Sequence, residues 1–247
     1  MFSVSDRNRV RGYILQLADL DERVVAGAVV GSMALTEGDR WSDLDLTFAV
    51  DDNIPVSDVL NDWTLKLAKE FDAVHLFDLP SRASIYRVFL LPGCLQFDLS
   101  FTPASKFGAT GPKFRIIFGS SVEKPYLQPP SAYELFGYAV HHALRARFCI
   151  ERGRFWHAEY WISSTRDYAL SLACRRRGLP ANFGRGFDDL PREVHRVFQN
   201  TFVTSLERDE LLRAFRNVIE GLLTETAEVK ELAAKVEPQL RMLMSAI

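Results

Sequence analysis

The 247-residue sequence has few of the features that mark several protein classes. Its three cysteines, Cys94, Cys149 and Cys174, are too few and too widely spaced for a disulfide framework or a zinc site, so we expect buried free thiols. No apolar run approaches the ~20 residues of a membrane span. The first residues lack the basic region and apolar core of a secretion signal. These absences favour a cytoplasmic globular protein without a membrane segment.

A strong charge of one sign is also missing. The chain has 30 lysines and arginines against 32 aspartates and glutamates, which gives a formal net charge of −2. Proteins that bind nucleic acid usually carry a pronounced basic surface, so a nucleic-acid partner is not indicated. Hydrophobic residues make up 47% of the chain, which is enough for the core of one large domain or two modest ones.

The first half of the chain alternates between helical and strand patterns. Apolar residues recur at helical spacing over 7–20 and 56–71. Five segments have the β-branched or alternating composition of strands: 24–30, 43–50, 74–77, 84–91 and 95–101. This order predicts a mixed β-sheet that helices cover on one side.

The second half changes to helical patterns alone. Residues 102–130 are rich in proline and glycine, and we interpret them as a linker. Ser131-x-x-Glu134 is a capping box. Helices are then expected over 131–151, 155–177, 191–203, 207–223 and 225–246. The predicted fold class is α/β (α+β), with a mixed-sheet catalytic core over 1–125 and an all-helical substrate-binding domain over 126–247.

A Gly-Ser pair follows the first predicted strand. Gly31 allows the backbone to turn tightly and to approach a ligand closely. Ser32 supplies a hydroxyl where a short helix, Met33 to Glu37, is expected to begin. Because the N–H groups at a helix start suit a phosphate, the pair predicts a phosphate-binding turn. A Gly-Ser turn by itself is also a common structural element.

Three aspartates on predicted strands form the second motif. Asp43 and Asp45 are two residues apart, so they point to the same face of their strand. Two carboxylates on one face repel each other unless a cation lies between them, and Mg²⁺ suits such oxygen-rich sites. Asp98 joins them if its strand, 95–101, lies beside 43–50. Three carboxylates would hold two metal ions, or one metal ion with a general base. An Asp-x-Asp pair that merely caps a turn is the alternative.

The glycine–serine turn, the Asp-x-Asp pair and the later strand aspartate resemble the DNA polymerase β-like nucleotidyltransferase superfamily. The resemblance covers roughly residues 24–101 and is closest to the small two-domain antibiotic nucleotidyltransferases that adenylylate aminoglycosides or lincosamides. It implies that Gly31 and Ser32 contact the triphosphate of ATP or another NTP. It implies that Asp43 and Asp45 bind two Mg²⁺ ions, with Asp98 as a metal ligand or the base. A homodimer is implied as possible.

Further side chains are candidates for contacts with the nucleotide or the acceptor. Lys113 and Arg115 follow the Asp98 strand and could reach a triphosphate, or they could be solvated loop charges. Glu159 and Arg166 share a face of the long second helix. Through the resemblance they would contact the acceptor, with Glu159 as a possible base, whereas an interhelix salt bridge is the alternative.

The resemblance predicts a Mg²⁺-dependent transfer of a nucleoside monophosphate, chiefly AMP from ATP, to a hydroxyl of a small acceptor. Pyrophosphate would leave. Two other functions stay open: transfer to a protein or a tRNA, and a non-catalytic nucleotide-binding module. The sequence does not name the acceptor or the preferred base.

Overall fold

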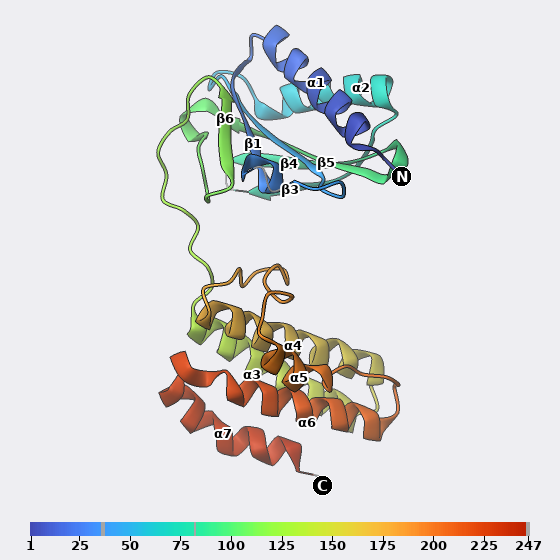
Figure 1. The fold of residues 1–247 in the computed structure, drawn as a ribbon, viewed down its shortest axis with the longest axis vertical. Helices are drawn as coiled ribbons and strands as arrows, with labels where there is room; N and C mark the ends of the chain where they lie inside the picture. Colours follow the sequence, from blue (N-terminus) through green and yellow to red (C-terminus); the bar gives the residue numbers. More distant parts are fainter. Residues whose placement is uncertain (36–37, 82, 246–247) are drawn as a thin grey trace. The chain divides into compact units, whose positions relative to one another are not determined.

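The computed structural model describes residues 1–35, 38–81 and 83–245. The chain divides into two compact units, Met1–Leu127 and Gln128–Ile247, which are described one at a time below (Figure 1). The first unit combines a sheet with helices and the second is helical. The predicted mixed-sheet core followed by a helical part is therefore confirmed.

The first unit is built on a six-stranded mixed sheet with the order β3-β4-β5-β2-β1-β6. Its strands are β1 (Val24–Val30), β2 (Leu44–Val50), β3 (Val74–Ser81), β4 (Ser84–Leu91), β5 (Leu95–Pro103) and β6 (Phe114–Phe118). β2 and β5 are parallel, and the other neighbouring pairs are antiparallel. The expected pairing of the 84–91 and 95–101 segments as a hairpin, with the latter beside 43–50, is thus confirmed.

Two helices cover one face of this sheet, as Figure 1 shows. α1 (Val4–Leu20) and α2 (Val56–Phe71) bury their apolar stripes against the even-numbered residues of β2 and the odd-numbered residues of β5. Trp63 is at the centre, with its ring 5.2 Å from that of Phe48 and 5.0 Å from that of Phe101. Because side chains alternate along a strand, the remaining residues of β2 and β5 face the opposite side.

The sequence-based boundaries of several elements change. α1 begins at Val4 rather than Arg7, because Ser3 and Asp6 form a capping box at its start. β3 extends to Ser81. The turn after β1 is a five-residue 3₁₀-helix, η1 (Gly31–Leu35), and the last two residues of the helix expected over Met33 to Glu37 lie outside the described residues.

The interpretation of 102–130 as a linker is wrong for one segment. Residues 114–118 form β6, which pairs antiparallel with β1. The run Phe114-Arg115-Ile116-Ile117-Phe118 has the aromatic and β-branched composition of a strand and lies between Pro112 and Gly119. The same region supplies η3 (Ala104–Lys106) and the buried ring of Phe107, which packs on Ala26, Ala28 and Ala49 on the face opposite the helices.

The second unit is a helical bundle around one apolar core. Its helices are α3 (Ala132–Glu151), α4 (Phe155–Arg176), α5 (Arg192–Gln199), α6 (Arg208–Thr224) and α7 (Lys230–Met244), with a 3₁₀ turn, η4 (Thr226–Glu228). The core draws on α3, α4 and α6 above all. Ser131 and Glu134 form the predicted capping box at the start of α3. The segment expected to be one helix over 225–246 divides into η4 and α7.

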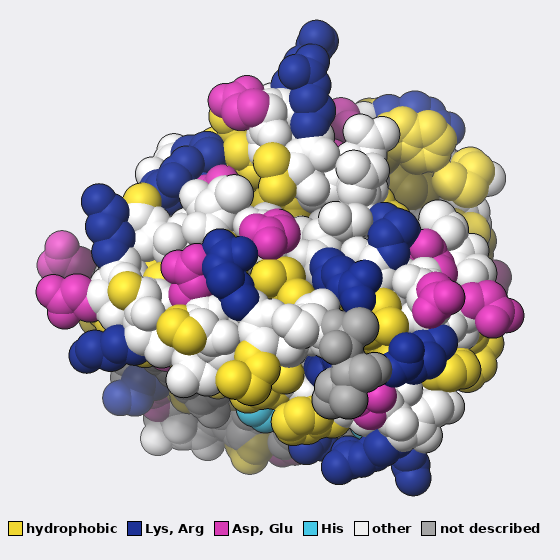
Figure 2. Space-filling model, turned by 90° about the horizontal axis from the view of Figure 1, so that it is seen from below, with side chains coloured by type: hydrophobic (Ala, Val, Ile, Leu, Met, Phe, Trp, Pro, Cys, Tyr) yellow, Lys and Arg dark blue, Asp and Glu magenta, His cyan; other side chains and the backbone are white. Residues whose placement is uncertain are grey.

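The three cysteines are free thiols in different environments. Cys149 and Cys174 are buried free thiols as expected, whereas Cys94 is exposed and the expectation is wrong for it, because it lies in the tight turn η2 (Pro92–Cys94) between β4 and β5. Within the described residues, no helix has both the length and the apolar character to cross a membrane. Basic and acidic side chains are interspersed over the face drawn in Figure 2.

A charged group anchors the sheet to α2. Asp21 follows α1 and accepts hydrogen bonds from the guanidinium of Arg23 at 2.8 Å and from Nε1 of Trp63 at 2.8 Å. Its side chain is only 9% exposed. The bond from Arg23 above all lowers the pKa of Asp21 from 3.8 to about 2. The ionised carboxylate is therefore the form that the folded unit stabilises.

This pKa shift predicts a loss of stability in acid. A lowered folded-state pKa gives stabilisation that is complete above pH 3.8 and disappears as the pH falls toward 2. Asp21→Asn should remove on the order of 1–2 kcal/mol of unfolding free energy at pH 7 and flatten the acid limb of stability against pH. Urea unfolding followed by tryptophan fluorescence measures both, with the exposed Asp19→Asn as the matched control. An Asp21→Asn curve parallel to that of the native chain would contradict the assignment.

Candidate metal and phosphate site

The parallel pairing of β2 and β5 brings the predicted carboxylates together. Asp45 and Asp98 are direct partners in the register of the two strands, so both point away from the helices. Asp43 lies just before β2 and two residues from Asp45, on the same face. Carboxylate oxygens of all three lie within 4.8 Å of one another, and each residue is partly buried. The three aspartates that the sequence singled out are thus neighbours in space.

The three carboxylates form a donor set that fits a divalent cation. Hard cations such as Mg²⁺ prefer carboxylate oxygens and keep several waters. Like charges this close repel each other, and burial raises the cost of the ionised forms. Burial first, and Asp43 second, raise the pKa of Asp98, while a bond from Nε2 of Gln96 at 2.9 Å opposes the rise. A cation would offset these unfavourable terms, so these residues could hold one.

The glycine turn lies directly against the carboxylates. Gly31 has a φ of +68°, in the left-handed region that L-residues with a side chain disfavour. A Cβ at this position would collide with the Oδ2 atom of Asp45. Two independent constraints, backbone conformation and space, therefore require glycine here. Ser32 follows in η1 and is partly buried, so the predicted phosphate turn and the acidic cluster are adjacent.

The two cations predicted for the nucleotide lie at the β6 end of the sheet. Arg115 is on β6 opposite Val29 of β1, and its Nε donates to the carbonyl of Ala34 in η1 at 3.2 Å. Its side chain remains exposed. Lys113 is the exposed residue immediately before β6. Arg115 is therefore tied to the glycine turn by a strand that the sequence analysis had interpreted as linker.

The residues predicted for the acceptor lie on α4 in the other unit. Ser163 donates to the carboxylate of Glu159 at 2.6 Å. The Arg166 guanidinium lies 4.5 Å from the ring centroid of Phe202, a cation–π contact. Neither residue forms the interhelix salt bridge that was their alternative among the described contacts. Their proximity to the three aspartates stays a prediction.

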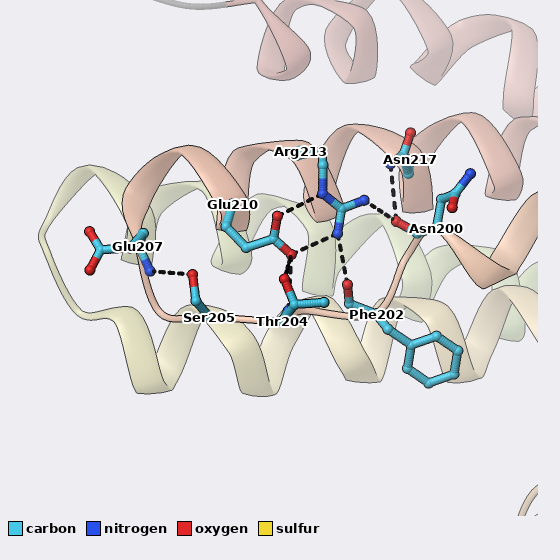
Figure 3. Close-up of polar contacts among 8 residues, drawn as sticks. All are labelled: Asn200, Phe202, Thr204, Ser205, Glu207, Glu210, Arg213 and Asn217. Carbon is cyan, nitrogen blue, oxygen red and sulfur yellow. Dashed lines mark hydrogen bonds and ion pairs between the residues drawn. The ribbon is translucent and has the colours of Figure 1, made fainter.

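A hydrogen-bonded loop holds Phe202 in this position (Figure 3). Arg213 of α6 donates to Glu210 at 2.7 Å and to the carbonyl of Phe202 at 2.8 Å. Glu210 in turn accepts from the backbone N–H of Thr204 at 2.9 Å. The loop between α5 and α6 is therefore fixed by side chains of α6, and it places the Phe202 ring against Arg166.

Arg7 is a residue of the site region that the sequence analysis missed. It is buried on α1, and its Nη1 donates to the carbonyls of Asp39 at 2.8 Å and Ser42 at 2.6 Å. The loop it holds leads directly into Asp43. The signal was present in the sequence, because Arg7 precedes Val10 by three residues and Ile14 by seven and so lies on the buried helical stripe.

Comparison with known proteins adds little to this geometry. No family profile and no curated protein matches the chain. Similar solved structures include the crystal structure of an aminoglycoside 6-adenyltransferase from Bacillus subtilis, with a TM-score of 0.40 and 13% identity over 94% of this chain and 96% of that chain. A likeness at this level carries no argument about chemistry, so the interpretation rests on the residues themselves.

Gly31→Ala tests the contact between the turn and the carboxylates. The added methyl group must displace Asp45, so we expect divalent-ion affinity to fall about tenfold or more. Isothermal titration with Mg²⁺ or Mn²⁺ measures it. Gly12→Ala on α1 is the matched control, since a Cβ there has nothing within 4 Å, and it should leave affinity unchanged. Native affinity in Gly31→Ala would refute the predicted geometry.

Arg7→Met tests the support of the loop before Asp43. Loss of the two carbonyl bonds should loosen residues 39–42 and weaken divalent-ion binding by about tenfold, because the candidate ligand Asp43 is no longer held. Arg9→Met, an exposed neighbour on the same helix, is the control for a general effect on α1. If Arg7→Met lowers thermal stability while Mg²⁺ affinity stays native, Arg7 supports only the fold.

Proposed function

We propose that the chain is a Mg²⁺-dependent nucleotidyltransferase that moves a nucleoside monophosphate, chiefly AMP from ATP, to a hydroxyl of a small acceptor. The observation that carries the proposal is the cluster of Asp43, Asp45 and Asp98 beside a turn where only glycine fits. Carboxylates that hold metal ions next to a phosphate-binding turn are what phosphoryl-group chemistry requires. The same function follows from the motif resemblance.

Each residue of the site has a role in this proposal. Asp43 and Asp45 would hold the ions, which supply a positive charge against the oxygens of the α-phosphoryl group when bound. Gly31 leaves space for the triphosphate, and Ser32 offers its hydroxyl and N–H to it. Arg115 extends the cationic side of the site from β6.

Asp98 is the proposed proton acceptor or third metal ligand. In the absence of a bound ion, burial above all and the charge of Asp43 raise its pKa above that of an ordinary aspartate, which favours proton uptake; a bound cation would oppose this rise. As a base it would take the proton of the acceptor hydroxyl while the oxygen of that hydroxyl bonds to the α-phosphorus. The bond from the α-phosphorus to the bridging oxygen breaks, and pyrophosphate leaves with that oxygen. Glu159 is the alternative base.

The helical unit is proposed to bind the acceptor through Glu159 and Arg166. The cation–π contact with Phe202 fixes the direction of the Arg166 side chain, which reduces the entropy lost when it binds an acceptor. An aminoglycoside or lincosamide is the acceptor class that the motif resemblance favours. The chain is proposed to act in the cytoplasm, with a homodimer as one assembly.

Asp45→Asn is the decisive substitution. It should lower nucleotidyl transfer by about 10²- to 10³-fold, because it removes a proposed metal ligand. The melting temperature should change little, because the substitution also removes a charge that repels the neighbouring carboxylates. Pyrophosphate release from ATP with Mg²⁺ and a panel of hydroxyl acceptors measures it. Asp19→Asn, exposed at the end of α1, is the control. Native transfer by Asp45→Asn would refute the assignment.

One screen identifies the acceptor and the nucleobase that the chain prefers in its nucleotide donor. The native chain is incubated with each of the four α-labelled nucleoside triphosphates, Mg²⁺ and antibiotic, sugar and nucleoside acceptors. We expect labelled small-molecule products with ATP as the best donor. Label found on protein or tRNA would show that a macromolecule, and not a small molecule, is the acceptor. ATP binding without pyrophosphate release would show that the chain is a non-catalytic nucleotide-binding module.

A further inference from the structure

Two adjoining cavities open onto the surface of the helical unit. The first has a volume of about 480 Å³, and its walls include Leu135, Asp167, Tyr168, Phe183 and Phe187. The second shares Pro130, Leu135 and Tyr168 with the first, and adds Glu134 and Tyr138. All of these residues belong to the helical unit. Neither is lined by Glu159 or Arg166.

A stripe of α4 forms one wall of the first cavity. Ser164, Asp167, Tyr168 and Ser171 follow one another at helical spacing and all line it. This stripe neighbours, but is not, the face of α4 that the sequence analysis chose. The cavity therefore presents a set of residues to which the proposed nucleotidyl transfer assigns no role.

Aromatic rings dominate the two cavities. Tyr138 and Tyr168 are stacked, with centroids 5.2 Å apart and planes at 21°, and Phe183 and Phe187 belong to the opposite loop. Aromatic faces carry partial negative charge and attract organic cations. An apolar ring would also pack between them. The walls thus favour a ligand with both a flat apolar part and a positive charge.

The charged groups that line the cavities are both acidic. Asp167 lines the first cavity and Glu134 the second. The ion pair of Asp167 with Arg166 spans 3.8 Å, at the long end for such pairs. The backbone and hydroxyl of Ser131, by hydrogen bonding, lower the pKa of Glu134, so it is ionised at neutral pH. Burial above all raises the pKa of Asp167, and the charge of Arg166 opposes that rise. A bound cation would favour the ionised form of both carboxylates, so they complement a cationic ligand.

The basic groups near the two cavities limit where the positive charge of a ligand could lie. The guanidinium of Arg185 lies 5.6 Å from the ring centroid of Phe183, so that ring already has a cation beside it. His142 contacts the Tyr168 ring at 5.1 Å, but burial above all lowers its pKa, so it is neutral at pH 7. Arg175 donates from Nη1 to the carbonyl of Pro130, a wall residue of both cavities, at 3.0 Å. Among the described contacts no cation lies over the Tyr138 or Tyr168 ring, so this stacked pair is the end of the cavities that offers aromatic faces to a cation.

Phe183 combines a left-handed backbone conformation with an exposed side chain. Its φ of +58° is in the left-handed region, which is unfavourable for a bulky residue, and its side chain is 91% exposed. Phe183 and Gly184 both have positive φ and are the central residues of a tight turn, which the N–H of Arg185 closes on the carbonyl of Asn182 at 3.2 Å; this turn accounts for the backbone and presents the Phe183 ring to solvent. The ring is already part of the cavity wall, where a bound ligand would bury it.

We infer that this aromatic-acidic pair of cavities is a binding site for a small organic ammonium ion with a ring-shaped apolar body. The amine lies at the Tyr138–Tyr168 end within reach of Asp167 or Glu134, and the ring packs on Phe183 and Phe187. The inference uses only residues of the helical unit. It holds whether or not the carboxylates of the sheet unit catalyse nucleotidyl transfer.

Three probes of similar shape and different charge test this site on the full chain. 2-Phenylethylamine is cationic, 2-phenylethanol neutral and 3-phenylpropionate anionic at pH 7. Ligand-observed NMR titration should give the amine a Kd at least about tenfold below that of the alcohol, and no saturable binding of the anion. Equal affinity for amine and alcohol, or preferential binding of the anion, would overturn the inference.

Variants locate the binding. Tyr168→Leu removes the ring and should raise the Kd of the amine about tenfold. Asp167→Asn removes a carboxylate whose side chain is 60% exposed, and it should raise the Kd about two- to fivefold. Trp156→Leu and Asp209→Asn, both exposed on helices of the same unit and outside the cavities, are the matched controls. If Tyr168→Leu fails to fold, Phe183→Ala tests the aromatic wall instead. This variant should stay folded, because a side chain that is 91% exposed adds little to stability. Native amine affinity in Asp167→Asn and Phe183→Ala would place the binding elsewhere and refute the site.

Discussion

Asp45 and Asp98 face each other across the parallel pair of β2 and β5, and the repulsion between them is resolved only by a cation, a proton or a hydrogen-bond donor. The register of these two strands sets that opposition, since each residue of β2 has one fixed partner on β5. A slip of β2 by one residue against β5 would turn Asp45 toward α1 and α2 and separate it from Asp98, which would keep its face. The apolar stripes of the two helices thus fix the face on which the charges lie.

The loop and turn that surround the carboxylates follow from this register. Gly31 must leave space for Asp45, and its positive φ turns the chain away from β1. Arg7 then holds the carbonyls before Asp43, so that the first acidic side chain enters the same face as the second. The site is therefore supported from a helix on the far side of the sheet, by one buried guanidinium.

The helical unit presents a different chemistry. Its cavities combine stacked tyrosines with carboxylates, whereas the sheet unit gathers carboxylates beside a glycine turn. Aromatic walls suit soft organic cations and carboxylate clusters suit hard metal ions. The two proposed sites would thus select cations of opposite kinds.

The strength of the sequence signals explains what could be predicted. Asp43 and Asp45 were readable because period-two alternation places them on one face, and Asp98 because its strand alternates clearly. β6 was missed because its residues lie among prolines and glycines. Arg7 was missed although its spacing places it on the buried stripe of α1, because only apolar residues were used to define that stripe. The cavity residues on α4 could not be found from sequence. Tyr168 and Phe183 meet only through the loop after α4, which no periodicity describes.

The order of strands in the sheet also affects how the first unit folds while the chain is being synthesised. β1 lies between β2, which follows it closely, and β6, which is the last strand to be made. β2 likewise waits for β5. When the chain has emerged only as far as the glycine turn and the start of β2, the edges of its strands therefore have no partners. Such long-range pairings slow folding and expose edges to aggregation, so the unit has a vulnerable interval that ends only when residue 118 emerges.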